Sequence, residues 1–194
     1  GINNATWNGL TVSDLSARTW HPNRAGVSLI DSSITTGSGD ISLKGLSWPT
    51  TFGATGTTNR GVSLTGNTSL STTSGSISIT GESYGAYYNA IGVLIGNVSA
   101  SSNNVSLTTT TGNITINGTA ADSSSGSGQR DGLVLATPGT SDQVTIKTSS
   151  GAISLTGTGN FTSTSYTTDA SGLRLQASGT NSRIQVVSQA ALLG

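Results

Sequence analysis

The sequence predicts an all-β chain folded as a right-handed parallel β-helix, or β-solenoid, of about five repeats of 31–40 residues. Three observations predict this fold. A strand motif recurs at nearly constant spacing, its apolar residues are spaced by two, and apolar residues with convincing helical spacing are absent from the 194 residues. A period of two is the pattern of β-strands, and a long motif kept in one register is typical of solenoids.

The first motif reads Gly-x-Ile-[Ser/Thr]-[Leu/Ile]-x-Gly and occurs at residues 39–45, 75–81, 112–118 and 151–157. Its first glycines are separated by 36, 37 and 39 residues. Five residues before each of these glycines stands an aliphatic residue, and two residues earlier a further matching position: Ile34, Leu70, Leu107 and Ile146, preceded by Ser32, Thr68, Val105 and Val144. A fifth copy is degenerate, with Ile184 and Val186 in register, Ala191 in place of the glycine and Leu193 at the next apolar position.

A second motif, Gly-apolar-x-apolar, begins each repeat at residues 26–29, 61–64, 92–95, 132–135 and 172–175. Each repeat therefore offers three short strands, which are unstable alone but can pair in parallel with their equivalents one coil away. We expect the glycines to supply turns with positive φ. One alternative is two coils of about 19 residues per repeat, but the segments 46–60, 82–90, 119–131 and 158–171 have no matching apolar alternation. Another is an antiparallel β-sandwich, which does not explain a register kept across four copies.

The shared register also predicts which residues form the interior. These are Val27, Leu29, Ile34, Ile41, Leu43, Val62, Leu64, Leu70, Ile77, Ile79, Leu107, Ile114, Ile116, Ile146, Ile153 and Leu155. We expect residues 1–194 to form a single solenoid segment, with an irregular first part over residues 1–25 and regular repeats over residues 26–194. We further expect it to be a fragment of a longer fibre, joined to further coils of the same chain or associating end to end.

The composition narrows the range of partners. Charged residues make up 8% of the chain, the formal net charge is zero and the basic residues are not clustered. Nucleic acid and anionic membrane surfaces are therefore poor partners, and no apolar run is long enough to insert into a membrane. Cysteine is absent, so in an extracellular protein the fold itself would have to provide the stability that disulfides often add.

Together the two motifs resemble the repeats of filamentous-haemagglutinin-like exoproteins of two-partner secretion, over roughly residues 26–194. The resemblance implies a secreted bacterial cell-surface adhesin with a right-handed parallel β-helix. It also implies a spacer within the fibre, with contact to a glycan or a cell surface. The family's secretion domain carries Asn-Pro-Asn-Gly and Asn-Pro-Asn-Leu, and His21-Pro22-Asn23-Arg24 matches neither. The resemblance therefore implies a segment from the middle of the fibre.

The sequence predicts no catalytic residue, no cofactor and no metal site. His21 is the one histidine and has no potential ligand at short spacing. Among the acidic residues we expect only Asp40 to fall inside a repeated strand motif, and its equivalents Ser76, Asn113 and Ala152 form no acidic ladder. The first alternative is nonetheless a carbohydrate-active β-helix enzyme, a polysaccharide lyase or hydrolase, because such enzymes share this fold and use clustered carboxylates.

A third class is an ice-binding solenoid with a regular array of threonines. The outward positions of the middle strand are mostly Ser and Thr, but Lys147 and Gln185 interrupt them. Aromatic residues are the remaining candidates for ligand contact, because they gather in the variable segments between repeats: Trp48, Phe52, Tyr84, Tyr87, Tyr88, Phe161 and Tyr166. They would either form a strip that stacks on sugars or each fold onto its own coil to bury apolar area; we favour the second.

Overall fold

The computed structural model describes residues 25–47, 58–85, 89–99, 102–122, 129–160 and 170–189. These ranges contain fourteen β-strands and no helix, and hence no helix able to cross a membrane. Every strand pairing is parallel. The all-β prediction is therefore confirmed, and the antiparallel sandwich is ruled out.

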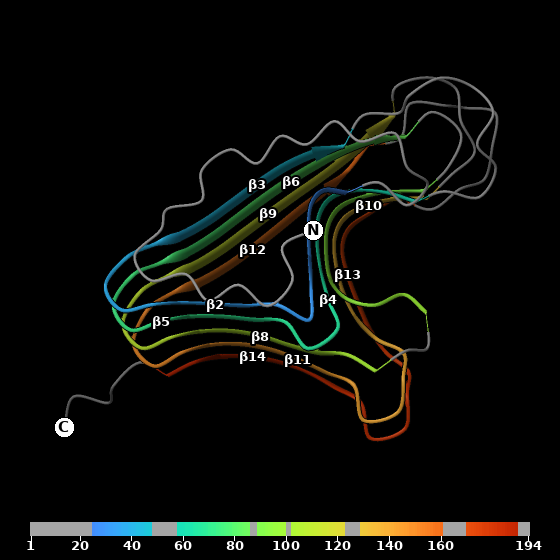
Figure 1. Ribbon diagram of the computed structural model, residues 1–194. Coiled ribbons are helices and arrows are strands. Elements are labelled where there is room, and N and C mark those ends of the chain that lie inside the picture. Colours follow the sequence, from blue (N-terminus) through green and yellow to red (C-terminus); the bar gives the residue numbers. More distant parts are fainter. Residues whose placement is uncertain are drawn as a thin grey trace.

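The strands form three sheets (Figure 1). Sheet A contains β1 (Ala25–Ile30), β4 (Asn59–Thr65), β7 (Ala90–Gly96), β10 (Arg130–Thr137) and β13 (Ala170–Ala177). Sheet B contains β2 (Ser33–Thr36), β5 (Ser69–Thr72), β8 (Asn104–Thr109), β11 (Gln143–Thr148) and β14 (Arg183–Ser188). Sheet C contains β3 (Ile41–Ser47), β6 (Ile77–Gly85), β9 (Ile114–Asp122) and β12 (Ile153–Gly159).

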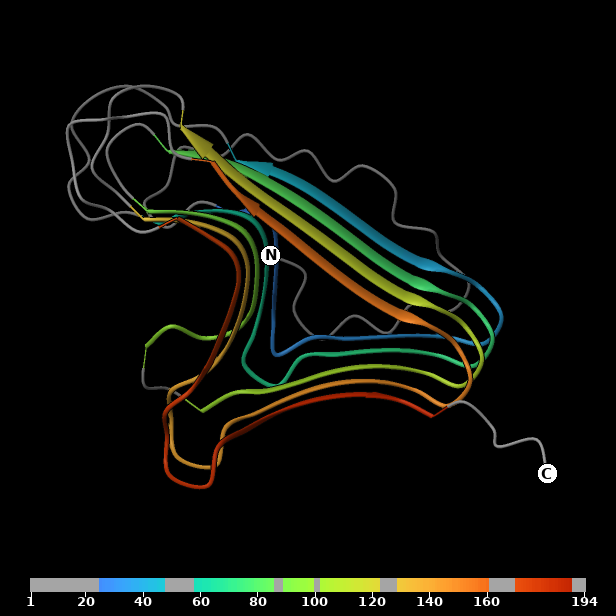
Figure 2. The ribbon, with the colours of Figure 1, turned by 180° about the vertical axis from the view of Figure 1, so that it is seen from behind.

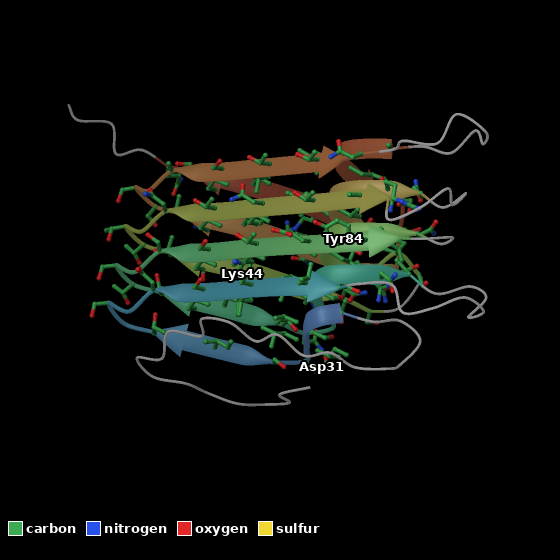
Figure 3. The ribbon with its side chains drawn as sticks, turned by 90° about the horizontal axis from the view of Figure 1, so that it is seen from above. Asp31, Lys44 and Tyr84 are labelled. Atoms are coloured by element: carbon green, nitrogen blue, oxygen red, sulfur yellow. The ribbon has the colours of Figure 1, made fainter. Side chains whose placement is uncertain are left out.

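The chain visits the sheets in the order A, B, C and then returns to A one level further along the axis. The described residues make four turns of three strands and the first two strands of a fifth. The winding is right-handed, as Figures 1 and 3 show together. One repeat is thus one long coil, and the alternative of two short coils per repeat is wrong.

The register between coils is the one that the motifs predict. Ile34 pairs with Leu70 and Leu70 with Leu107 in sheet B, while Ile41 pairs with Ile77 in sheet C. The degenerate fifth copy keeps this register, because Val144 pairs with Ile184 and Ile146 with Val186; Leu193 lies outside the described residues. Equivalent side chains therefore stack directly above one another along the axis.

The stacked aliphatic side chains form one continuous core. Of the sixteen predicted interior residues, fourteen are buried in it, and only Ile153 and Leu155, near the C-terminal end, are partly exposed. The interior also contains hydroxyls that the aliphatic pattern does not reveal. Thr68 is fully buried and its hydroxyl donates to the Thr65 carbonyl at 2.6 Å, so it meets no water.

The motif glycines have a different role from the one expected, and the prediction of positive-φ turns at these glycines is wrong. Among the described glycines, positive φ occurs at Gly66 and Gly96, which lie outside the motifs. The motif glycines instead allow backbones to approach closely. A Cβ atom at Gly45 would lie 2.1 Å from the carbonyl oxygen of Gly61, where sheets C and A meet. A hydrogen is the only substituent that fits there.

A column of threonines joins sheets B and C at the next corner. Thr109 donates its hydroxyl to the Gly75 carbonyl of the coil below at 3.1 Å and accepts from the Gly112 amide at 3.0 Å. Thr148 repeats this pattern one coil on, donating to the Gly112 carbonyl at 3.0 Å. Both threonines are at most 5% exposed. Each hydroxyl therefore satisfies backbone groups that the turn would otherwise leave buried without partners.

Candidate binding surfaces

The outer face of sheet C carries mostly Ser, Thr and Asn side chains, with Lys44, Leu46 and Glu82 among them, in rows across the coils (Figure 3). The rows, defined by strand pairing, are Ser42-Ser78-Thr115-Ser154, Lys44-Thr80-Asn117-Thr156 and Leu46-Glu82-Thr119-Thr158. Neighbouring strands lie about 4.8 Å apart, which sets the spacing within each row. We call this array the sheet C face. Its hydroxyls and amides can exchange hydrogen bonds with an extended polar ligand.

Tyr84 is the one predicted aromatic residue within the described ranges. It lies near the end of β6 beside Ala121 of β9 and is partly buried. The Asn59 side-chain amide donates to the Tyr84 carbonyl oxygen at 3.2 Å, which ties the end of sheet C to the start of sheet A. In Figure 3 Tyr84 lies on the sheet C face, toward the end of β6. The remaining candidates, Trp48, Phe52, Tyr87, Tyr88, Phe161 and Tyr166, lie outside the described residues.

The strands of sheet C all end at one corner of the solenoid. β3, β6, β9 and β12 end at neighbouring positions of sheet C, and each is followed by a strand of sheet A. Ser47 pairs with Ser83, and Trp48 and Tyr84 each follow one of these serines in the sequence. The strand order thus brings the ends of the sheet C strands and the starts of the following sheet A strands to one corner.

The outer face of sheet B shows the interruption that the sequence predicts for an ice-binding array. Thr108 pairs with Lys147 and Thr145 pairs with Gln185, so a long charged or amide side chain stands within each hydroxyl row. Lys147 is exposed. A regular lattice of hydroxyls therefore does not extend over all five coils of sheet B.

The acidic residues need one correction. Asp40 does not lie inside a strand, because β3 begins at Ile41, whereas Glu82 lies in β6 and Asp131 in β10. Asp40 and its predicted equivalents Ser76, Asn113 and Ala152 do stack on one another. The Asp40 carboxylate accepts from the Ser76 amide at 2.7 Å, and the Asn113 side chain accepts from the Ala152 amide at 2.8 Å. In the described part of the chain, no three His, Cys, Asp or Glu side chains come together as a metal site would require. His21 lies outside it.

Asp131 belongs to a polar cluster on the outer face of sheet A that sequence reasoning missed. It is 1% exposed and forms an ion pair with Arg174 at 3.1 Å, and the neighbouring Arg130 is fully buried. The Arg130 guanidinium donates to the Gln129 carbonyl at 3.1 Å. Arg60 lies two strands away in the same row as Asp131, and burial lowers the pKa of its guanidinium. Asp131 and Arg174 are thus paired with each other across adjacent coils.

Apolar side chains cover the outer face of sheet A over β7 and β10. Leu94 and Val134 pair across β7 and β10 and are fully buried, although they alternate with interior residues and therefore point away from the main core. Val98, on the connection after β7, packs against them. A signal existed in the sequence: Leu94 and Val134 fill a motif position that holds Ser28, Ser63 or Arg174 in the other repeats. Sheet A is thus covered on both faces in its middle coils.

Asp142 has a structural role at the corner between sheets A and B. It is 1% exposed, and its two carboxylate oxygens accept from the Asn103 amide at 2.9 Å and the Gly139 amide at 2.8 Å. Asn103 in turn accepts from the Gly66 amide one coil below at 2.8 Å. These hydrogen bonds connect successive turns of the solenoid. Both oxygens of the Asp142 carboxylate accept from backbone amides.

Comparison with known proteins adds no relative. No protein-family model matches this chain, and neither the curated proteins nor the solved structures contain a match. The repeats and the geometry of the solenoid are therefore the basis for a functional proposal.

Proposed function

We propose that this chain is a structural and adhesive segment of a secreted bacterial surface fibre, of the kind formed by filamentous-haemagglutinin-like exoproteins of two-partner secretion. The observation that carries the proposal is the unbroken stacking of equivalent strands, over five levels in sheets A and B and four levels in sheet C. Each coil adds one further layer to the same core and the same three sheets, which is how a chain builds a stiff rod of any length. Further coils of the same polypeptide would extend this rod.

The sheet C face and Tyr84 on that face support an adhesive role. Rows of hydroxyls and amides can bind the hydroxyls of a glycan, and an aromatic ring such as Tyr84 can pack against the apolar face of a sugar. The arrangement is repetitive and suits an extended ligand that crosses several coils. Binding without chemical change is the expected outcome.

A glycan array tests the adhesive part of the proposal directly. The parent chain should bind a subset of glycans, Tyr84→Phe should retain that binding, and Tyr84→Ala should weaken it by roughly tenfold or more, as the loss of a stacked ring implies. The matched control is Lys147→Ala, which changes an exposed residue of β11 in sheet B, outside the sheet C face. No binding to any glycan would contradict the adhesive proposal and leave a spacer role.

Measuring the cleavage of polysaccharides distinguishes the enzymatic function from the adhesive one. A panel of pectins, alginates and bacterial exopolysaccharides should be bound or ignored but not cleaved. Cleavage that Asp40→Ala abolishes would replace the adhesive proposal with an enzymatic one. Cleavage that instead depends on Asp131, which lies inside a strand beside Arg174, would have the same consequence and would place the chemistry on sheet A.

A further inference from the structure

Arg60 of β4 is a cation without a partner in the described part of the chain. The residue is partly exposed, but its Nε is shielded from solvent and meets no hydrogen-bond acceptor. Within the described ranges its guanidinium forms no ion pair, since Asp131, the acid in its row, pairs with Arg174. Burial lowers the pKa of the Arg60 guanidinium, because the charged form loses hydration there.

Arg60 differs in this respect from the other arginines of the described ranges. Each of these has a polar partner within the fold: Arg130 the Gln129 carbonyl, Arg174 the Asp131 carboxylate and Arg183 the Gln143 amide oxygen. A charge that is partly desolvated and has no partner lowers the stability of a fold. An interaction with a group outside the fold would account for an arginine at this position.

The neighbours of Arg60 in its row supply no negative charge. Strand pairing places Ala25 of β1 on one side and Ile91 of β7 on the other, and both side chains are apolar. Asp131 follows one strand beyond Ile91, which puts it two strand spacings, or roughly 10 Å, from Arg60. Apolar neighbours lower the local dielectric constant, so they strengthen the attraction between the guanidinium and an anion that reaches it.

Arg60 lies next to the end of sheet C that carries Tyr84. The side-chain amide of the preceding Asn59 donates to the Tyr84 carbonyl oxygen at 3.2 Å, and a Cβ atom at Gly61 would stand 2.3 Å from the Glu82 amide nitrogen. β4 therefore begins beside the end of β6, at the corner of sheets C and A that Figure 2 shows from behind. A single extended ligand can meet both the sheet C face and Arg60.

We propose that Arg60 binds the carboxylate of an acidic glycan, such as one that contains uronic acids. This inference rests on the adhesive function proposed above and names the class of glycan. The planar guanidinium matches the planar carboxylate and can donate two parallel hydrogen bonds to it. The bound carboxylate supplies the negative charge that the neighbours of Arg60 lack. One cation is too few for nucleic acid, whose binding requires many phosphate contacts.

A glycan array that pairs each acidic glycan with its methyl ester tests the proposal, because esterification removes the charge and keeps the sugar. The parent chain should bind at least one acidic glycan roughly tenfold or more tightly than its ester, as the loss of a charged hydrogen bond implies. Arg60→Met should abolish this difference. The matched control Arg183→Met changes an exposed arginine of β14 in sheet B and should keep the difference.

The stability of the free chain gives a second readout, which a merely structural arginine would move in the opposite direction. Arg60→Met keeps much of the aliphatic length and removes the unpaired charge, so it should raise the urea midpoint of unfolding. Arg183→Met should leave the midpoint unchanged. A lower midpoint for Arg60→Met, or failure of this variant to fold, would assign Arg60 a structural role and overturn the proposal.

The array also separates this proposal from the adhesive one. Equal binding of every acid and its ester, or a preference for acids that survives Arg60→Met, would reject the role of Arg60 and leave the adhesive function standing. A preference for sulfated glycans without dependence on a carboxylate would do the same. No binding to any glycan would reject both proposals. Acid-dependent binding that Arg60→Met removes and Tyr84→Ala leaves unchanged would support the role of Arg60 and exclude Tyr84 from the contact.

Discussion

The backbones of Gly81 and Gly92 lie so close that a Cβ atom at position 81 would stand 2.1 Å from the carbonyl oxygen of Gly92. The two glycines belong to the two different repeat motifs, and the same contact recurs one coil on between Gly118 and Gly132. Sheets C and A therefore converge on a column of glycine pairs. The triangular cross-section closes at this column, and each pair is a site where an added methyl group meets backbone.

Gly81→Ala should destabilise the fold by about 1–3 kcal/mol, the range for overpacking a rigid site. Gly37→Ala is the control, because a Cβ atom there meets nothing within 4 Å and the φ angle is not positive. That substitution should be neutral or stabilise by up to about 1 kcal/mol through the unfolded chain. Urea unfolding measures both, and equal stability of the two variants would show that the convergence of the sheets is not tight.

Ile114→Asp should prevent folding, because Ile114 is fully buried in the aliphatic core and an unpaired carboxylate there costs several kcal/mol. Asn117→Asp introduces the same charge in the same strand at an exposed position and should change little. Circular dichroism and thermal melting distinguish the two. A melting temperature of the Ile114 variant equal to that of the parent would mean that the interior has been assigned wrongly.

Thr109→Val should destabilise the chain by about 1–3 kcal/mol, since valine keeps the shape but leaves the buried amide of Gly112 without its acceptor. The comparison is Thr111→Val, two residues away, where the side chain is exposed. Denaturant midpoints give the difference. If the two substitutions cost the same, the threonine column contributes no more than an exposed turn residue.

Asp142→Ala should cost more stability than Asp40→Ala. Both carboxylates accept backbone amides, but Asp142 is buried and accepts two of them, whereas Asp40 is exposed and accepts one. Losing the buried acceptor leaves the amides of Asn103 and Gly139 unsatisfied, at a cost of about 1–3 kcal/mol. Parallel unfolding curves measure the difference, and the reverse order would contradict the structural role of Asp142.

Arg174→Met should destabilise β13, because it removes the ion pair with the buried Asp131 carboxylate while keeping much of the aliphatic length. Arg183→Met removes an arginine of the neighbouring strand whose side chain is exposed and bonded to Gln143, and should have little effect. Hydrogen exchange resolved by peptide should show faster exchange in β13 for the first variant alone.

The repeat pattern alone determined the strands, their order in the coil and the interior rows. The period of two and the repeat length of 36 to 39 residues can both be read directly from the sequence. The threonine column was not predicted, although the sequence contains its signal. A threonine stands three residues before each first motif glycine, at Thr36, Thr72, Thr109 and Thr148, and in the structure these threonines form the buried column at the corner of sheets B and C.

Features that depend on contact through space were decided only by the tertiary structure. The apolar residues Leu94 and Val134 at a position that is polar in the other repeats are a sequence signal for a second buried face, but the sequence does not show which residues, such as Val98, pack against them. The ion pair of Asp131 with Arg174 joins adjacent coils at positions that share no motif slot. Likewise, the repeat pattern assigns Leu29 and Leu175 to equivalent positions, whereas in the structure Leu29 is buried and Leu175 is exposed. Each stacked strand needs a neighbour on both sides, and only the folded chain determines which strands have one.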